Sequence, residues 1–204
     1  MSGGRLPSVA VIVEALQKGA LSDRSEPSVD GISVVMDPVL ALHRNNIIQW
    51  ECEDDARRDS ADDTVVASAK RDIDRLNGVR HRLIEAIDHR IASSIDLRDG
   101  APLVTESPGM AIDRLSVLII RLASTETRAS SGCADATLFA ERLPRLRRQL
   151  GALEEGIGLL LDDLARGNRS FVVYESLKLY GGKDAASFDG DSEAASRAAG
   201  IRHD

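Results

Sequence analysis

The sequence predicts an all-α protein: an antiparallel four-helix-type bundle with an extra short helix at each end. Apolar residues recur at spacings of three and four over four long segments, which is the period of a helix that buries one face. The connections between these segments are short and contain Gly, Pro, Ser and Asp, as expected when each helix packs beside its chain neighbour. No run of residues that could form a strand has a visible partner strand.

The composition is typical of one soluble domain with tails. The chain has 204 residues, of which 43% are hydrophobic and only 3% aromatic, so aliphatic side chains must build the core. A net charge of −7 argues against general nucleic-acid binding, because Lys and Arg hold phosphate backbones. No stretch is apolar enough to be a membrane span or a signal peptide. Since Cys52 and Cys133 lack metal-ligand spacing, we expect a cytoplasmic protein with reduced thiols.

Three parts of the chain differ in character. Residues 1–35 contain a short amphipathic helix at 7–18, followed by a linker that begins at 19. Residues 36–180 form the predicted bundle domain. Residues 181–204 are small and polar, and they predict a disordered tail because they offer little apolar surface to bury.

The first three long helices have recognisable starts. Asp37-Pro38 predicts an N-cap and a first-turn proline, and this helix should run to about Arg58. The second helix covers about 63–94. Ser107-Pro108 repeats the capping pattern, and the third helix should run from there to about Arg128.

The fourth long helix has the most regular apolar repeat, from Phe139 to Leu164, with Asp135 as a candidate cap. Pro144 lies inside it and predicts a kink or break near 140–143, because an interior proline costs about 3 kcal/mol. Gly167 should end this helix as a C-cap glycine. Residues 169–180 are predicted as a last short helix, although their β-branched and aromatic residues would also suit a strand.

Polar residues occupy positions on two helices where a core is expected. On the first long helix the three-and-four spacing passes through Val39, His43, Asn46, Trp50, Glu53 and Arg57. On the second helix, Arg80 follows Ile73 and Leu76 in the apolar stripe. Charges buried in a bundle cost several kcal/mol unless they are paired. This polar seam must therefore face water, form a paired network or bind a ligand.

Helix register gathers these residues at one end of the bundle. If the first turn centres near residue 60, residue n lies opposite roughly residue 121 − n, which places Arg80 near His43. The same reasoning across the next loop places Glu85 and Asp88 near the start of the third helix. We expect Arg80 to pair with Glu106 or Asp113. The candidate ligand-binding residues are His43, Asn46, Asn77, Arg80, Glu85, Asp88, Glu106 and Asp113.

Four segments resemble a family of bacterial proteins known as domain of unknown function 4254. They are HRNNIIQWECEDDAR, KRDIDRLNGVRHRLIEAID, TESPGMAIDRLSVLIIR and VVYESLKLY, and the likeness spans roughly residues 36–180. The resemblance implies a mainly helical domain and implies no activity. The family pattern includes the same seam residues, among them His43, Arg80 and Asp113.

Two functional classes stay open, because each residue alone also has a structural explanation. The first is a bundle that binds a small anionic ligand, or an enzyme acting on a phosphate- or sugar-containing one. Arg80 would hold the anion and His43, Glu85 or Asp113 would exchange protons, in a cavity lined by His43 and Arg80. The second is a non-catalytic module that binds a protein partner or a second copy. It requires a fully paired seam and an exposed apolar patch on the fourth helix or at 171–180.

A third and weaker hypothesis is a metal-dependent phosphohydrolase. It requires at least three carboxylate oxygens converging on one point. The sequence contains no His–Cys ligand spacing, Gly-rich phosphate loop or nucleophile elbow, so it predicts no metal site and no cofactor.

Overall fold

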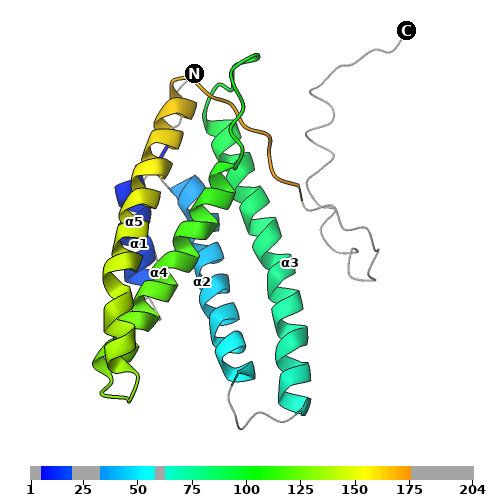
Figure 1. The fold of residues 1–204 in the computed structure, drawn as a ribbon. Helices are drawn as coiled ribbons and strands as arrows, with labels where there is room; N and C mark the ends of the chain where they lie inside the picture. The colour runs from blue at the N-terminus through cyan, green and yellow to red at the C-terminus, as the bar shows by residue number, and fades with distance from the viewer. Residues whose placement is uncertain (1–5, 20–32, 58–62, 176–204) are drawn as a thin grey trace.

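The computed structural model describes residues 6–19, 33–57 and 63–175 (Figure 1). These residues form five helices and no strand. The helices are α1 (Val9–Gly19), α2 (Ser33–Ala56), α3 (Asp63–Ser94), α4 (Pro108–Ser130) and α5 (Ala136–Ala165). The prediction of an all-α protein is confirmed for the described residues, and the predicted tail at 181–204 lies outside them.

The long helices α2 to α5 run in alternating directions (Figure 1). Helix α2 packs on α3, and α4 packs on α5 while also contacting α1, α2 and α3. Among the described residues, α5 contacts neither α2 nor α3. Helix α1 contacts both α2 and α5, and so lies between them. As a result α3 and α5 stand apart, and α4 lies between them (Figure 1).

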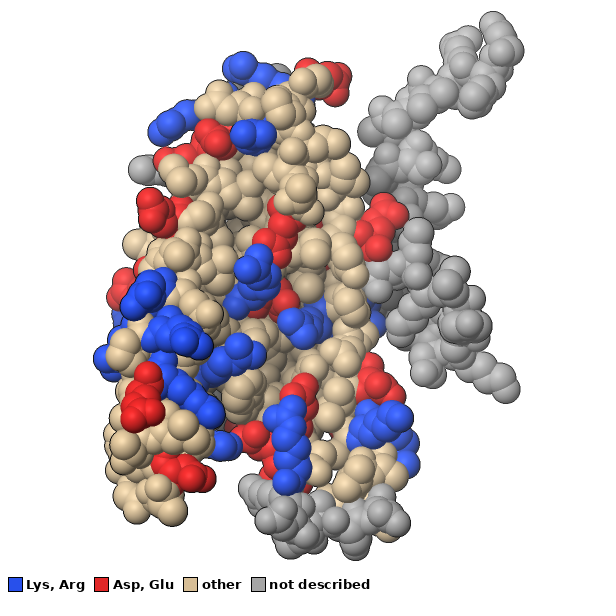
Figure 2. All heavy atoms as spheres, viewed as in Figure 1, with Lys and Arg blue, Asp and Glu red and all other residues tan. Residues whose placement is uncertain are grey.

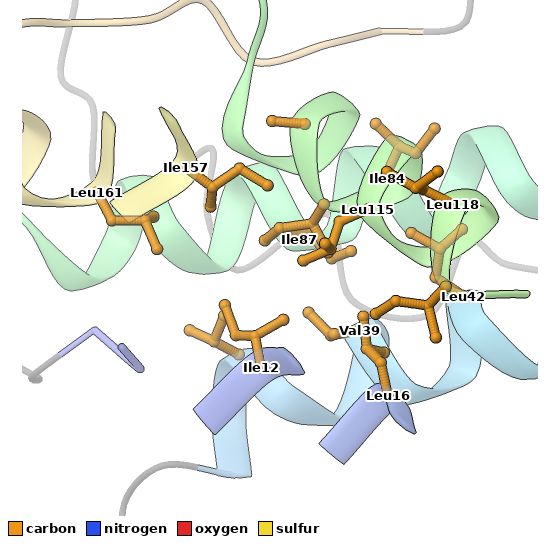
Figure 3. Packing of buried hydrophobic residues seen from close by; sticks show 14 of the residues in the cluster. Ile12, Leu16, Val39, Leu42, Ile84, Ile87, Leu115, Leu118, Ile157 and Leu161 are labelled. Carbon is orange, nitrogen blue, oxygen red and sulfur yellow. The ribbon is translucent and has the colours of Figure 1, made fainter. Parts of the chain in front are cut away.

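The core is aliphatic and draws on all five helices. Ile12 and Leu16 of α1 are completely buried, and they pack beside Val39 of α2 and Ile157 of α5 (Figure 3). Burying such a side chain fully contributes about 1.5–3 kcal/mol. Helix α1 is therefore an integral part of the core, although its sequence predicted only a short added helix.

Most predicted helix boundaries are confirmed. Helix α3 covers the predicted range, and Ser107 caps α4 by accepting a hydrogen bond from the Met110 amide, with Pro108 at the first helical position. Gly167 follows α5 with a φ of 69°, the left-handed conformation that glycine adopts most easily. Asp135 occupies the N-cap position of α5 but makes no side-chain capping hydrogen bond.

The cap predicted at Asp37-Pro38 is wrong, and so is the break predicted near Pro144. Helix α2 begins at Ser33, so Pro38 lies inside it. The helix extends back because Val35 and Met36 are buried in the core. Helix α5 continues without a break through Pro144. Pro144 and Ala140, whose carbonyl the proline leaves without its helical partner, are both exposed residues.

The predicted last helix is also wrong where it can be compared, at residues 169–175; residues 176–180 lie outside the described residues. Ser170 forms a parallel bridge with Leu103, and residues 171–175 are extended. The Val104 amide donates to the Ser170 carbonyl at 2.9 Å, and the Ser170 amide donates to the Pro102 carbonyl at 3.0 Å. The partner that the sequence did not reveal is thus the α3–α4 loop, and β-branched Val172 and Val173 suit the extended backbone.

Candidate functional site

A buried polar network joins α2, α3 and α4. His43 Nδ1 lies 2.8 Å from Ser116 Oγ, and Asn46 Nδ2 donates to both Ser116 Oγ at 3.1 Å and Asp113 Oδ1 at 3.0 Å. Arg80 completes the network with two hydrogen bonds to Asp113, from Nε at 2.8 Å and from Nη2 at 2.5 Å. The predicted pairing of Arg80 with a carboxylate is confirmed, with Asp113 as its partner.

Helical spacing positions these groups. His43 and Asn46 are three residues apart on α2, as are Asp113 and Ser116 on α4, so each pair shares one helix face. The two faces meet, since Asn46 bonds to both residues of the α4 pair. Arg80 is 28% exposed in its side chain, whereas Asp113 is 7% exposed. The network is thus closed to solvent except at the arginine.

The two ionisable groups at the ends of the network differ in charge. The hydrogen bonds that Arg80 donates to Asp113 raise the pKa of Arg80 against the opposing effect of burial, so its guanidinium stays charged. Burial lowers the pKa of His43 to about 4, so the imidazole is neutral at pH 7. The Leu16 carbonyl partly opposes this shift, although it does not meet hydrogen-bond geometry with Nε2.

The seam continues along α2 beyond this network. Asn45 Nδ2 donates to the Leu76 carbonyl at 3.2 Å, which is the pairing that the predicted register requires, and Gln49 Nε2 donates to Asn77 Oδ1 at 3.1 Å. Some buried polar atoms on α2 nevertheless have no hydrogen-bond partner among the described residues. They are His43 Nε2, Asn45 Oδ1, Asn46 Oδ1, Gln49 Oε1 and Trp50 Nε1. Side chains and backbone of the described residues therefore pair the seam only in part.

Asp88 forms a separate cluster at the start of α4. It is fully buried, and its two oxygens accept from the backbone amides of Gly109 at 2.7 Å and Tyr174 at 3.2 Å. Burial raises the pKa of Asp88, while hydrogen bonds from Ser107 and the two amides oppose the rise. Tyr174 also stacks on His81, and its hydroxyl lies 3.1 Å from His81 Nδ1. This cluster fastens the extended segment 171–175 to α3 and α4.

The eight sequence-predicted site residues therefore separate into groups. His43, Asn46, Arg80 and Asp113 share one network, and Asn77 bonds to Gln49 beside it. Asp88 belongs to the cluster at the α4 start. The remaining two are paired locally, Glu85 with His89 at 3.9 Å and Glu106 with Arg114 at 2.7 Å.

Sequence reasoning missed several residues of this region. Ser116 could have been found, because it lies one helical turn after Asp113 on the same face. Asn45 and Gln49 lie beside the predicted stripe of α2, and a wider stripe would have included them. Arg121 and the α5 residues near it could not be found from the sequence. They line a groove, described below, whose existence depends on which helices do not contact each other.

A groove of about 540 Å³ lies outside Arg80, between α3 and α5, with α4 as its floor. Basic side chains gather over α4 and α5 on this face of the molecule (Figure 2). The lining residues are Arg80, Arg114, Val117, Leu118, Arg121, Gln149, Ala152 and Leu153. The cavity expected beside the seam is thus lined by Arg80 but not by His43, which is only 1% exposed.

The guanidinium groups of the groove differ in their partners. Arg80 is held by Asp113, and Arg114 donates to Glu106 at 2.7 Å. Arg121 is exposed, and its side chain has no hydrogen-bonding or carboxylate partner among the described residues. Two such guanidinium groups in one groove, one already positioned and one without a partner among the described residues, can hold an anionic ligand.

A smaller cavity of about 280 Å³ lies under the extended segment, lined by Val104, Thr105, Ser107, Met110 and residues 171–175. None of the described residues that line it is a Lys or Arg. Within the described residues, no group of three or more His, Cys, Asp or Glu side chains is placed to hold a metal ion. The convergence of carboxylates that a metal-dependent phosphohydrolase requires is thus not met in these residues.

The comparison with known families agrees with the sequence resemblance. The family model of proteins of unknown function DUF4254 matches residues 37–173, which include α2 from Asp37, all of α3 to α5 and the extended segment to Val173. The chain belongs to the DUF4254 family. Comparison with curated proteins and with solved structures finds no match. In the described part of this DUF4254 protein, no helix is both long enough and apolar enough to cross a membrane.

Proposed function

We propose that this DUF4254 protein is a helical module that binds a small anionic molecule in the groove between α3 and α5. The observation that supports it is the set of guanidinium groups around one groove, with Arg121 lacking a carboxylate partner among the described residues. The chain as a whole carries a net charge of −7, so a basic groove is a local exception to its composition.

The buried network supports the proposal by fixing Arg80 before a ligand arrives. Asp113 holds the Nε and Nη2 sides of the guanidinium, and Asn46 holds Asp113. The Nη1 donors of Arg80 remain for a ligand. A side chain that is already ordered loses little rotamer entropy on binding, and this saves about 0.5–1.5 kcal/mol. The polar seam then serves to position an arginine at the groove.

Binding is better supported than catalysis. His43 is neutral and buried away from the groove, and Asp113 is occupied by Arg80 and Asn46. An enzyme acting on a phosphate- or sugar-containing molecule was the alternative suggested by the sequence. Among the described residues that line the groove, however, there is no carboxylate and no histidine that could exchange a proton. The partner-binding alternative keeps one supporting feature, because Leu159 on α5 and Val172 are exposed large apolar residues in the two places where it expects a patch, outside the groove.

Two finer features belong to the same proposal. We infer that α2 to α5 are an antiparallel bundle of four-helix type in which α1 takes the place between α2 and α5. We also infer that the protein works in the cytoplasm, where Cys52 and Cys133, both free thiols, would stay reduced.

A ligand screen tests the proposal. Thermal shift and calorimetry would compare inorganic phosphate, short carboxylates, sugar phosphates and nucleotides on the wild type, Arg121→Gln and Arg90→Gln. Arg90 is an exposed arginine of α3 outside the groove and serves as the matched control. A ligand at a hundred times its Kd should add about 2.7 kcal/mol, a shift of several degrees.

Loss of a charge-assisted hydrogen bond should weaken binding about tenfold or more in Arg121→Gln. The Arg90→Gln control should keep the wild-type affinity. Equal weakening in the two variants would contradict the proposal, as would the absence of a shift with every compound.

A further inference from the structure

Half of the described residues that line the groove are apolar. The position of these apolar residues relative to the arginines indicates which class of anion the groove would bind. We infer that the ligand is an amphiphilic anion: a single carboxylate or phosphate-ester head group on an aliphatic or aromatic body. This inference rests on the proposed function and specifies what the groove would select. Its basis is the order of polar and apolar residues along α4 and α5, together with the charge balance of the groove.

On α4 the two arginines lie at opposite ends of an apolar stretch. Arg114 and Arg121 are seven residues apart, which is two helical turns or about 10 Å. Val117 and Leu118 lie between them on the same helix face, and both line the groove. A site for a polyphosphate would bring its cations together around one point. Here an apolar surface separates them.

Helix α5 places one amide and two apolar residues on the opposite wall. Arg147 pairs with Glu126 at 2.9 Å, and α4 and α5 run antiparallel (Figure 1). Counted from this pair, Gln149 lies about one turn beyond Arg121, and Ala152 and Leu153 lie about level with Arg121. The amide of Gln149 can donate beside the guanidinium of Arg121, so the head group belongs at this end. Arg80, held by Asp113 beside Arg114, then faces the other end of the ligand. The apolar body would then lie along Leu118, Ala152 and Leu153.

The charge balance favours a single head group. Of the three arginines that line the groove, Arg80 is compensated by Asp113 and Arg114 by Glu106. Only the charge of Arg121 has no carboxylate partner among the described residues. A nucleoside triphosphate would bring several negative charges close to Glu106 and Asp113. A carboxylate or phosphodiester brings one, and the methylenes behind it gain from leaving water along the apolar stretch.

A homologous series of ligands tests the inference by calorimetry on the full-length protein. The probes are acetate, butyrate, hexanoate and octanoate below their aggregation limits, with octyl phosphate, hexanol and ATP beside them. A methylene that leaves water completely improves affinity about fourfold, so roughly two- to fourfold per methylene is expected in an open groove. Octanoate should therefore bind at least about tenfold more tightly than butyrate. Octyl phosphate carries nearly two negative charges at pH 7, so it should bind no more tightly than octanoate if the groove suits a single charge.

Two pairs of variants show whether this binding occurs in the groove. Arg121→Gln should weaken octanoate about tenfold, and Arg90→Gln should not. Ala152→Asp places a carboxylate at the groove and should abolish binding, whereas Ala140→Asp on an exposed part of the same helix should not. Circular dichroism of each variant confirms that the helices are intact.

The outcomes distinguish a failure of the amphiphile inference from a failure of the proposed anion binding. Arg121-dependent binding that is as tight for acetate or ATP as for octanoate would overturn the amphiphile inference and leave anion binding standing. If no anion binds, both are overturned. If octanoate binds equally to wild type, Arg121→Gln and Ala152→Asp, or no more tightly than hexanol, the inference fails because the contact is apolar only and lies outside the charged groove.

Discussion

Asp88 and Asp113 are both buried carboxylates where α3 meets α4, but their partners differ in kind. Asp88 accepts hydrogen bonds from the backbone amides of Gly109 and Tyr174, which are fixed by the path of the chain. Asp113 accepts from the side chains of Asn46 and Arg80, and the arginine extends to a solvent-open groove. The first carboxylate can only hold the fold together. The second also determines where a charged group is presented to solvent.

The largest expected effect concerns the Asp88 cluster. A Cβ atom added at Gly109 would lie 2.5 Å from the Ile84 carbonyl oxygen and 2.8 Å from Asp88 Oδ1. Because a backbone atom cannot move aside cheaply, Gly109→Ala should lower the free energy of unfolding by about 3 kcal/mol or more. Gly151→Ala is the control, since a Cβ there meets nothing within 4 Å. It should stabilise helix α5 by about 0.5–1 kcal/mol. Urea denaturation of both variants checks this, and equal stabilities would show that α3 and α4 are not in close contact.

The Asp113 network should be sensitive to acid through His43. Its pKa is lowered from 6.5 to about 4 in the folded state, so between these values the unfolded chain binds more protons. Stability should fall as the pH drops through this window, by about 3 kcal/mol at the end of it. In His43→Gln this component of the pH dependence should be absent. The exposed His89→Gln control should keep it, and unfolding curves between pH 4 and 7 measure the difference. A wild-type slope that persists in His43→Gln would mean that His43 is not buried as described.

The next largest expected effect is the coupling energy between Arg80 and Asp113. Removing one partner of a buried ion pair leaves the other uncompensated, but Arg80 is 28% exposed and can partly regain water. A double-mutant cycle with Arg80→Gln and Asp113→Asn should therefore give a coupling energy of about 2 kcal/mol. The exposed pair Arg147–Glu126 should give less than about 1 kcal/mol. If the two coupling energies are alike, the Asp113 network does not fix Arg80.

The smallest effect compares two helix starts. Ser107 accepts from the Met110 amide, so Ser107→Ala should cost about 1 kcal/mol. Asp135 makes no capping hydrogen bond, so Asp135→Ala should cost only about 0.3 kcal/mol through the helix dipole. Thermal denaturation of the two variants distinguishes them, and a larger loss at Asp135 would reverse the assignment of the caps.

Local features of the fold could be predicted from the sequence. Ser107-Pro108 predicted the start of α4. The polar residues at core positions of α2 and α3 predicted a polar seam that includes Arg80. Long-range features could not. The apolar spacing of Ile12 and Leu16 shows that α1 buries a face, but not that this face lies between α2 and α5. The extended segment from Phe171 depends on hydrogen bonds to a loop some 70 residues away, which no local preference reveals.

The groove is also a long-range feature that the sequence does not predict. It exists because α3 and α5 do not meet, and that separation depends on how every helix packs on α4. From the sequence alone, Arg114 and Arg121 are ordinary exposed residues of an amphipathic helix. Only the positions of α3 and α5 show that they line a groove. Conversely, Asp88 and Glu106 lie close to the predicted end of the bundle. Their partners, however, are the backbone and Arg114 rather than a shared ligand site.

The most direct test of the account is an NMR titration of the protein with octanoate, observing the backbone amides and the arginine Nε–Hε groups. The account predicts that the Nε–Hε signals of Arg80, Arg114 and Arg121 and the amides around Leu118 and Leu153 shift together with one Kd. The amides of Gly109 and Tyr174, held by Asp88, should stay in place. Shifts that concentrate at Gly109 and Tyr174, or that spread equally over every exposed arginine, would contradict it.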